Sequence, residues 1–533
     1  MVHSGILVQE NIICQFLLVY KIKMIMKRIL LFILTIGLCM TGCKDFLDMP
    51  PKNVKVIYTT EDVKEAMSLF LYATANSNAG GYNQMVSYNL VYYAGGRIIY
   101  PFSRYVNICA AMASDDVEML GFVNQNTDSP ARGGYTYRNE FSEIRNWESY
   151  RFANQTWKAT FLAVGYLNNV LNDLSKVPDY DKTEHERISG EARVIRAYYL
   201  FRLNALFAPY DNDNYGIPMT FDAEVTSGSA RWKQTDIYKT LIHELTEVLE
   251  YETVPKISWN IFYNERIIKA ILAQIYQYKA ESCAGEPDDW SKAETYAREA
   301  RDGARIENTV DEQKELNYAP ADQAYYTLDK PHQFALLRIA HPGDGGNNYA
   351  PWGTPSDPQQ RVNPELFAMY DAEDIRVSVF FKIINNTPYW VKLQSRGSVD
   401  VCSETHPLFR YSDLLLIEAE AKARQNAPEA LLLLNEFKSS KIPGYAGFQG
   451  SNVLDEILRE RRKEFALEEQ MRWLDMKRLR VSVTREALDD DNMSQFYTLE
   501  ANDYRYALPI PEEAELMYNN ISQNPGWPAS KED

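Results

Sequence analysis

The chain has 533 residues and a formal net charge of −17. A chain of this length can form two or three domains, but no Ser-, Gly- or Pro-rich linker divides it, so we expect one large body. The acidic balance argues against binding to nucleic acid and against lying flat on an anionic membrane.

The N-terminal segment has the layout of a secretory signal. Lys27-Arg28 precedes an apolar run over 29–40, which is too short to cross a bilayer because a spanning helix needs about 20 residues. The run ends in Thr41-Gly42-Cys43, which is typical of a bacterial lipobox whose cysteine is acylated and becomes the mature N-terminus. An ordinary cleaved signal with an incidental Cys43 is the alternative.

These features predict a signal peptide over 1–42 and a single folded body over 43–533. A second apolar run over 12–20 lies ahead of the signal, so we expect translation to begin at Met24 or Met26. Residues 1–42 carry four Lys or Arg and one Glu, which leaves the body with a net charge of −20. We therefore expect lipid, and not surface charge, to hold the body on a membrane, with more than one acyl chain for stable anchoring.

Apolar residues at three- and four-residue spacings predict amphipathic helices through most of the body. The predicted ranges are 157–174, 184–207, 236–249, 266–280, 290–304, 411–424, 428–438 and 454–473. Within 290–297, large and small residues are spaced as in a tetratricopeptide helix, although no strict 34-residue period is present. The predicted fold is mostly α, with about four degenerate helix pairs stacked around one long core.

Long irregular segments are predicted between the helix pairs, over 75–146, 308–363 and 481–505. Loops of that length inside a compact body usually carry function. Beyond Cys43 the cysteines are Cys109, Cys283 and Cys402, and none belongs to a CxxC pair. We expect buried apolar fillers, with a single Cys283–Cys402 bridge as the alternative.

Common catalytic and cofactor motifs are missing from the sequence. It contains no GxGxxG, Walker loop, GxSxG or HExxH pattern. The pairs Asp115-Asp116 and Asp288-Asp289 could serve as the acid and base of a glycosidase, but adjacent residues point apart, so we expect solvated or capping roles. The stretch from Asp211 to Asp222 half resembles a calcium loop, yet Tyr215 replaces a ligand. We predict no catalytic residue, no metal and no cofactor.

Ten short motifs occur in order along the mature chain. They are CKDFLDMP at 43–50, SDD at 114–116, GEARVIRAYY at 190–199, YGIPM at 215–219, YDAEDIR at 370–376, RYSDLLLIEAEA at 410–421, ERRKEF at 460–465, RWLD at 472–475, PIPEE at 509–513 and QNPGW at 523–527. In number and order they resemble the SusD/RagB family, the surface-exposed nutrient-binding lipoproteins of the Bacteroidetes.

The resemblance implies a fold, a place and a partner. The fold is a mostly helical body of four tetratricopeptide-like pairs with long ligand-binding loops. Members sit on the cell outer membrane as a lid over a SusC-type TonB-dependent transporter, and they capture glycans or, in some cases, peptides. Charged residues over 460–475 have spacings that permit ion pairs, so we expect a structural network there. The 523–527 motif is expected to act as a terminal clamp.

Aromatic residues in the glycine-rich segments are the candidates for ligand binding, since flat rings match the apolar faces of sugars and Asn or Arg side chains reach the hydroxyls. The candidates are Tyr82, Tyr88, Tyr92, Tyr93, Tyr100, Arg104, Tyr105, Asn107, Asn347, Asn348, Tyr349 and Trp352. For each ring, packing within its loop is the alternative role.

Three functions stay open at this point. A glycan-binding lipoprotein is favoured, with millimolar to micromolar affinity because each stacked ring contributes only about 1 kcal/mol beyond burial. A protein that binds peptides or another nutrient is the second. A glycoside hydrolase is the third, and it requires a pair of loop carboxylates about 5–10 Å apart in a cleft.

Overall fold

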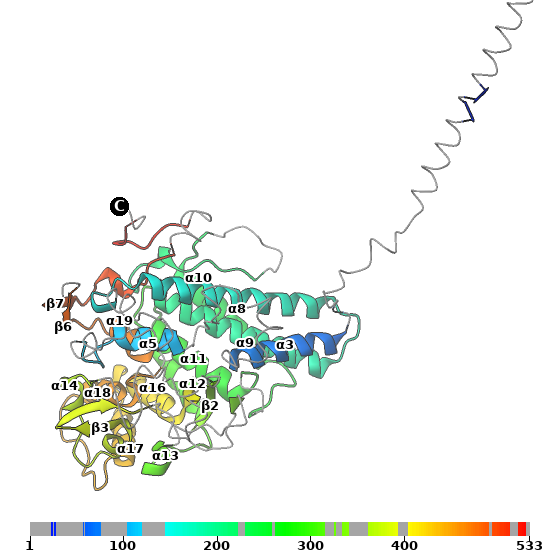
Figure 1. Ribbon diagram of the computed structural model, residues 1–533. Coiled ribbons are helices and arrows are strands. Elements are labelled where there is room, and N and C mark those ends of the chain that lie inside the picture. The colour runs from blue at the N-terminus through cyan, green and yellow to red at the C-terminus, as the bar shows by residue number, and fades with distance from the viewer. Residues whose placement is uncertain are drawn as a thin grey trace, which may run out of the picture. The chain divides into compact units, whose positions relative to one another are not determined.

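The computed structural model describes the folded part of the chain with several gaps. The described residues are 23, 24, 26, 27, 57, 59–75, 104–119, 144–221, 230–257, 262–314, 325–326, 333–340, 361–392, 403–468, 470–489, 493–511 and 521–528. The chain divides into two units, residues 1–58 and 59–533 (Figure 1). The predicted signal peptide over 1–42 and Cys43 lie almost entirely outside the described residues. Of the helices that are described, none is both long and apolar enough to cross a membrane.

Helices dominate the second unit, as predicted. In its first half they are α3 (Thr60–Ala75), α5 (Arg104–Ala113), α8 (Tyr150–Lys176), α9 (Lys182–Phe207), α10 (Gln234–Leu249), α11 (Glu265–Lys279) and α12 (Asp289–Ala300). From α8 to α12 each helix packs against the next, and Figure 1 shows α8, α9 and α10 side by side. Apolar periodicity predicts α8 to α12, although α8 begins seven residues before the predicted start. Helices α3 and α5 lie outside the predicted ranges.

The second half continues the array. Its helices are α13 (Val310–Lys314), α14 (Pro364–Phe367), α15 (Ile375–Phe380), α16 (Tyr411–Arg424), α17 (Glu429–Lys441), α18 (Val453–Phe465) and α19 (Met471–Arg478). Helix α16 packs against α12, α17 and α18. The helical pairs are therefore observed, and α16 has the predicted bounds.

One predicted helix, 454–473, is wrong, because the chain breaks between α18 and α19. Leu467 has a φ of 64°, in the left-handed region that ends a helix. The ammonium of Lys392 caps the C-terminal end of α18, because it donates to the carbonyls of Glu464 (2.6 Å) and Ala466 (2.9 Å). The backbone N–H of Leu467 donates to the carboxylate of Asp116 at 3.3 Å. Contacts from distant segments thus stabilise the break.

Within the described residues, three small antiparallel sheets lie in or near segments predicted to be irregular. The strands are β1 (Tyr325–Tyr326), β2 (Gln333–Ala340), β3 (Phe381–Ile384), β4 (Thr387–Trp390), β5 (Ser403–Arg410), β6 (Val483–Leu488) and β7 (Ser494–Leu499), paired in the orders β1-β2-β5, β3-β4 and β6-β7. The β3–β4 turn holds Asn385 and Asn386 at positive φ, as a two-residue hairpin loop requires. The predicted irregularity is therefore wrong over α5, α13, β1, β2 and the β6–β7 hairpin.

The central helix α9 is buried from Gly190 to its end. A Cβ atom added at Gly190 would lie 2.3 Å from ring atoms of Tyr263, so only glycine permits this close approach. The contact brings the backbone before α11 against α9. There the carboxylate of Glu191 accepts hydrogen bonds from the N–H groups of Tyr263 (2.7 Å) and Phe262 (3.3 Å).

Candidate ligand-binding site

Most of the predicted binding residues lie outside the described residues. These are Tyr82, Tyr88, Tyr92, Tyr93, Tyr100, Asn347, Asn348, Tyr349 and Trp352. Arg104, Tyr105 and Asn107 lie in the first turns of α5, where only the backbone is described. The structure describes the chain that flanks two aromatic segments, defined as residues 76–103, which carry the candidates from Tyr82 to Tyr100, and residues 341–360, which carry those from Asn347 to Trp352.

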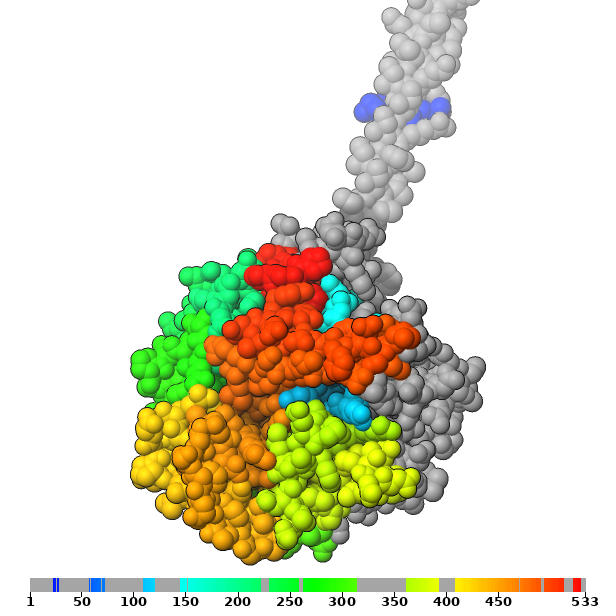
Figure 2. Space-filling view, turned by 90° about the vertical axis from the view of Figure 1, so that its left-hand side faces the viewer, coloured from blue at the N-terminus to red at the C-terminus, as the bar shows by residue number. Residues whose placement is uncertain are grey.

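The flanks of the two segments meet. After α5, Val117 pairs with Val362 in an antiparallel bridge, and Val362 follows the second aromatic segment directly. Two backbone hydrogen bonds extend the pairing, from Glu118 N–H to the Arg361 carbonyl (3.1 Å) and from Asn363 N–H to the Asp116 carbonyl (3.0 Å). Figure 2 shows the blue segment that includes α5 against the yellow-green surface of 361–392. Helix α5 is about 15 Å long and ends at Ala113, four residues before Val117, so it connects Arg104 and Tyr105 to this junction.

Asp115 anchors the turn between α5 and the junction. Its carboxylate accepts two hydrogen bonds from Arg472, at 2.6 and 2.7 Å, and lies 3.0 Å from Arg462. Burial acts to raise the pKa of Asp115, but the charges of Arg472 and Arg462 outweigh it and lower the pKa below its usual value. Asp115 is therefore ionised and paired.

Asp116 is completely buried. Burial and the charge of Asp115 raise its pKa to about 6. Its carbonyl accepts from the indole N–H of Trp390 at 3.3 Å as well as from Asn363. The predicted solvated or capping role is wrong for this aspartate pair, because both side chains are buried at the junction and serve as structural anchors.

The other acidic candidates also have protein partners. Lys279 lies 2.8 Å from both Asp289 and Glu286, and Lys292 lies 2.7 Å from Asp288. Glu286, Asp288 and Asp289 bring their oxygens within 4.8 Å of one another, but the Lys279 ammonium already supplies the positive charge there.

The stretch from Asp211 to Asp222, which half resembles a calcium loop, also has protein partners for its described carboxylates. Asp213 accepts from the Thr235 N–H at 2.8 Å, at the start of α10, and Asp211 pairs with Arg480 at 2.7 Å. Asp222 lies outside the described residues. The described carboxylates of this stretch thus act as a cap and an ion pair.

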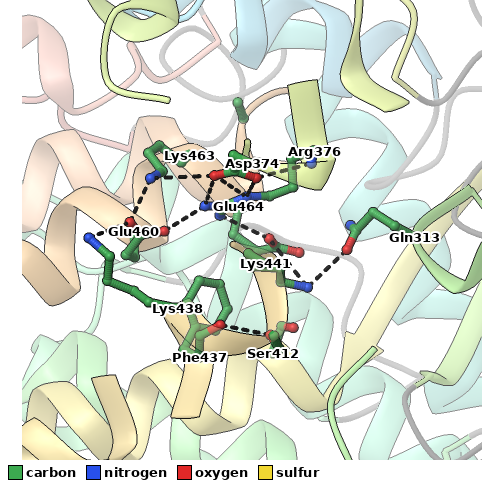
Figure 3. A network of polar contacts seen from close by, with 12 residues as sticks. Gln313, Asp374, Arg376, Ser412, Phe437, Lys438, Lys441, Glu460, Lys463 and Glu464 are labelled. Carbon is green, nitrogen blue, oxygen red and sulfur yellow. Dashed lines mark hydrogen bonds and ion pairs between the residues drawn. The ribbon is translucent and has the colours of Figure 1, made fainter. Parts of the chain in front are cut away.

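The charged network predicted over 460–475 is confirmed, and Figure 3 shows part of it. Arg376 donates to Asp374 (2.7 Å), Glu460 (2.7 Å) and Glu464 (3.2 Å), and all four side chains are fully buried. Glu464 also accepts from Arg410 at 2.7 Å. Burial alone would raise the pKa of Glu464, but Lys441, Arg410 and Arg376 hold it well below its usual value.

The terminal clamp over 523–527 is also confirmed. Asn524 donates to the carbonyls of Phe207 (2.6 Å) and Leu508 (2.7 Å), and the indole N–H of Trp527 donates to the Ala507 carbonyl at 2.7 Å. The clamp fastens the end of the chain to the C-terminal end of α9.

The cysteines differ from expectation at one position. Cys109 is buried, as predicted, whereas Cys283 is an exposed free thiol. The filler role is therefore wrong for Cys283, and the alternative bridge to Cys402 is not formed. Cys402 itself lies outside the described residues.

Two sequence profiles match parts of the chain. Residues 104–277 match the profile described as "Starch-binding associating with outer membrane", and residues 385–527 match the profile described as "SusD family". The chain belongs to the SusD/RagB family. The first match begins at α5, and the second includes the 460–475 network and the terminal clamp.

Solved structures of SusD-like proteins share the fold. A SusD superfamily protein from Bacteroides vulgatus is 20% identical, with 88% of this chain and 100% of that chain covered and a TM-score of 0.64. The surface glycan-binding protein A from Bacteroides uniformis is 18% identical, with 87% and 99% covered and a TM-score of 0.62. A SusD-like carbohydrate binding protein from Bacteroides vulgatus is 18% identical, with 87% and 97% covered and a TM-score of 0.61. No curated protein matches the chain.

Proposed function

We propose that this SusD/RagB chain captures an oligo- or polysaccharide at the cell surface and passes it to a SusC-type TonB-dependent transporter. Family membership supports binding, and two proteins of the same fold are named for binding glycan or carbohydrate. The observation that carries the site is the hydrogen-bonded junction at Val117 and Val362, which joins the flanks of both aromatic segments. The rings of both segments then contribute to one site.

The chemistry of the candidates suits a sugar. Tyrosine and tryptophan rings stack on the apolar faces of pyranose rings, and asparagine amides both donate to and accept from hydroxyls. Stacking of a few rings gives millimolar to micromolar affinity, which permits release to a transporter. A catalytic role is not part of this proposal, because the described aspartate pairs Asp115-Asp116 and Asp288-Asp289 are engaged in ion pairs and backbone contacts.

The place of action completes the proposal. The apolar run over 29–40 would direct export, and acylation of Cys43 would tether the body to the outer membrane with its ligand site on the outside. An outer-membrane association agrees with the description of the profile that matches residues 104–277.

Replacing Tyr349 and Trp352 together with alanine is expected to weaken polysaccharide binding about thirtyfold, since two stacked rings contribute about 2 kcal/mol. The measurement is retardation of the mature chain, carrying Cys43→Ser, in native gels cast with amylopectin, dextran, xylan or galactomannan. The melting temperature should not change.

Tyr180→Ala is the matched control, because Tyr180 is an exposed tyrosine remote in sequence from both aromatic segments. Equal retardation of wild type and the double variant would contradict the site. If no polysaccharide retards the wild type but a peptide mixture binds in calorimetry, the peptide alternative replaces the glycan.

A further inference from the structure

The guanidinium of Arg485, in β6, joins three segments that are far apart in sequence. It donates to the carbonyl of Met112 at 2.7 Å, to the carbonyl of Arg145 at 2.9 Å and to the carbonyl of Ile144. In return, Arg145 donates to the carbonyl of Leu488, at the end of β6, at 3.1 Å. One planar group thus fastens the β6–β7 hairpin both to α5 and to the turn that precedes α8.

Trp147 lies directly beneath that group. The Arg485 guanidinium carbon is 3.9 Å from the centre of the indole, a close cation–π contact. The indole N–H donates to the carbonyl of Ala113 at 2.8 Å, and Trp147 is completely buried. Its φ of 62° is unfavourable for a bulky residue, so the surrounding contacts hold the backbone in this conformation.

Together these side chains cover the C-terminal end of α5. The last carbonyls of a helix have no partner within the helix. Here the carbonyl of Met112 accepts a hydrogen bond from Arg485, and the carbonyl of Ala113 accepts one from Trp147. The carbonyl of Ala111 accepts from the hydroxyl of Ser114 at 2.6 Å. The position of α5 is therefore set by side chains from outside the helix.

Burial at this position is unfavourable for the positive charge of Arg485. Among the described residues no carboxylate lies within ion-pair distance of Arg485, which is 9% exposed. Burial lowers the pKa of Arg485 to about 9. A buried cation without a counterion is a poor source of stability, whereas the fork of a guanidinium can meet three carbonyls at once. The contacts of Arg485 therefore fit a geometric role better than a stabilising one.

We propose that Arg485 and Trp147 are positioning residues that hold α5, and with it the binding residues expected in its first turns, against the junction of the two aromatic segments. The proposal rests on the proposed function for its consequence, which is ligand affinity. Its mechanical part, the hold on α5, stands without any ligand. The hairpin β6–β7 becomes a support of the site although it carries none of the candidate binding residues.

Arg485→Met tests the proposal, with Arg231→Met as the matched control. Arg231 is likewise an arginine that donates to three backbone carbonyls, those of Tyr215, Gly216 (2.8 Å) and Ser522 (3.0 Å), with its guanidinium over the Tyr215 ring. Its described hydrogen bonds join the turn after α9 to Ser522, and none of them reaches α5. Amide hydrogen exchange is measured over 104–119, 144–149 and α11, in the mature chain with Cys43→Ser.

Arg485→Met is expected to raise exchange at least tenfold over 104–119 and 144–149 while α11 is unchanged, and Arg231→Met is expected to leave all three regions as in wild type. Retardation by amylopectin, dextran, xylan or galactomannan should weaken at least tenfold in Arg485→Met and less than twofold in Arg231→Met. Unchanged exchange over 104–119, or equal loss of retardation in the two variants at equal melting temperature, would overturn the proposal. If no polysaccharide retards the wild type, the glycan function fails and the exchange result alone decides the hold on α5.

Discussion

Replacing Arg376 with leucine is expected to lower the free energy of unfolding by about 3–5 kcal/mol, because it removes a counterion that three buried carboxylates share. Asp374, Glu460 and Glu464 all accept from this guanidinium, and none of them is exposed to solvent. The loss of charge contributes more to this decrease than the change in side-chain shape. Urea denaturation followed by circular dichroism gives the difference directly.

Arg305→Leu is the control for this change. Arg305 pairs with Glu312 at the surface, and an exposed pair contributes at most about 1 kcal/mol. Adding Asp374→Asn to Arg376→Leu should recover part of the loss, since the other cation near Asp374, Lys463, is 3.7 Å away and the change removes the carboxylate that depends most on Arg376. A loss below about 1 kcal/mol for Arg376→Leu would mean that the network is not a main support of the fold.

The stability of the wild type is expected to fall relative to Glu191→Gln as the pH rises from 4.5 to 8. Burial raises the pKa of Glu191 to about 7, against 4.5 for the ordinary side chain, although hydrogen bonds from Tyr263 and Phe262 act in the opposite direction. The folded state therefore holds a proton that the unfolded state releases in this range. Stability from that proton is complete below pH 4.5 and is lost as the pH rises through 7.

The expected change is about 3 kcal/mol, since each pKa unit corresponds to about 1.4 kcal/mol. Glutamine keeps a carbonyl to accept the two N–H groups but has no charge to bury. Urea denaturation of both proteins at pH 5, 6, 7 and 8 measures the effect, with the exposed Glu250→Gln as control. Parallel curves for wild type and Glu191→Gln would show that the buried carboxyl does not titrate in this range.

The helices could be predicted because burial of one face leaves a period of 3.6 in the sequence. The sequence does not predict the hairpin β6–β7, because its strands, VTREAL at 483–488 and SQFYTL at 494–499, show no clear alternation of apolar and polar residues. The break at Leu467 could not be predicted either. It depends on Lys392 and Asp116, which are distant in sequence and meet it only in the folded chain.

The contacts around the candidate site are even harder to predict from the sequence, because they join residues that are far apart in the chain. The sequence predicts a solvated or capping role for Asp115, because its partner Arg472 lies 357 positions away. Arg485 gave no signal at all, since its partners are backbone carbonyls that any residue supplies. Composition and motifs indicated which segments carry the aromatic residues. Only the folded chain shows that the flanks of these segments are joined at Val117 and Val362.

Calorimetric titration with one oligosaccharide, cut from the polysaccharide that retards the wild type, tests most directly whether the two segments form a single site. One molecule should bind per chain, and Tyr105→Ala and Trp352→Ala should each weaken that same event while the stoichiometry stays at one. Two bound molecules per wild-type chain, with each variant losing a different one, would contradict the account.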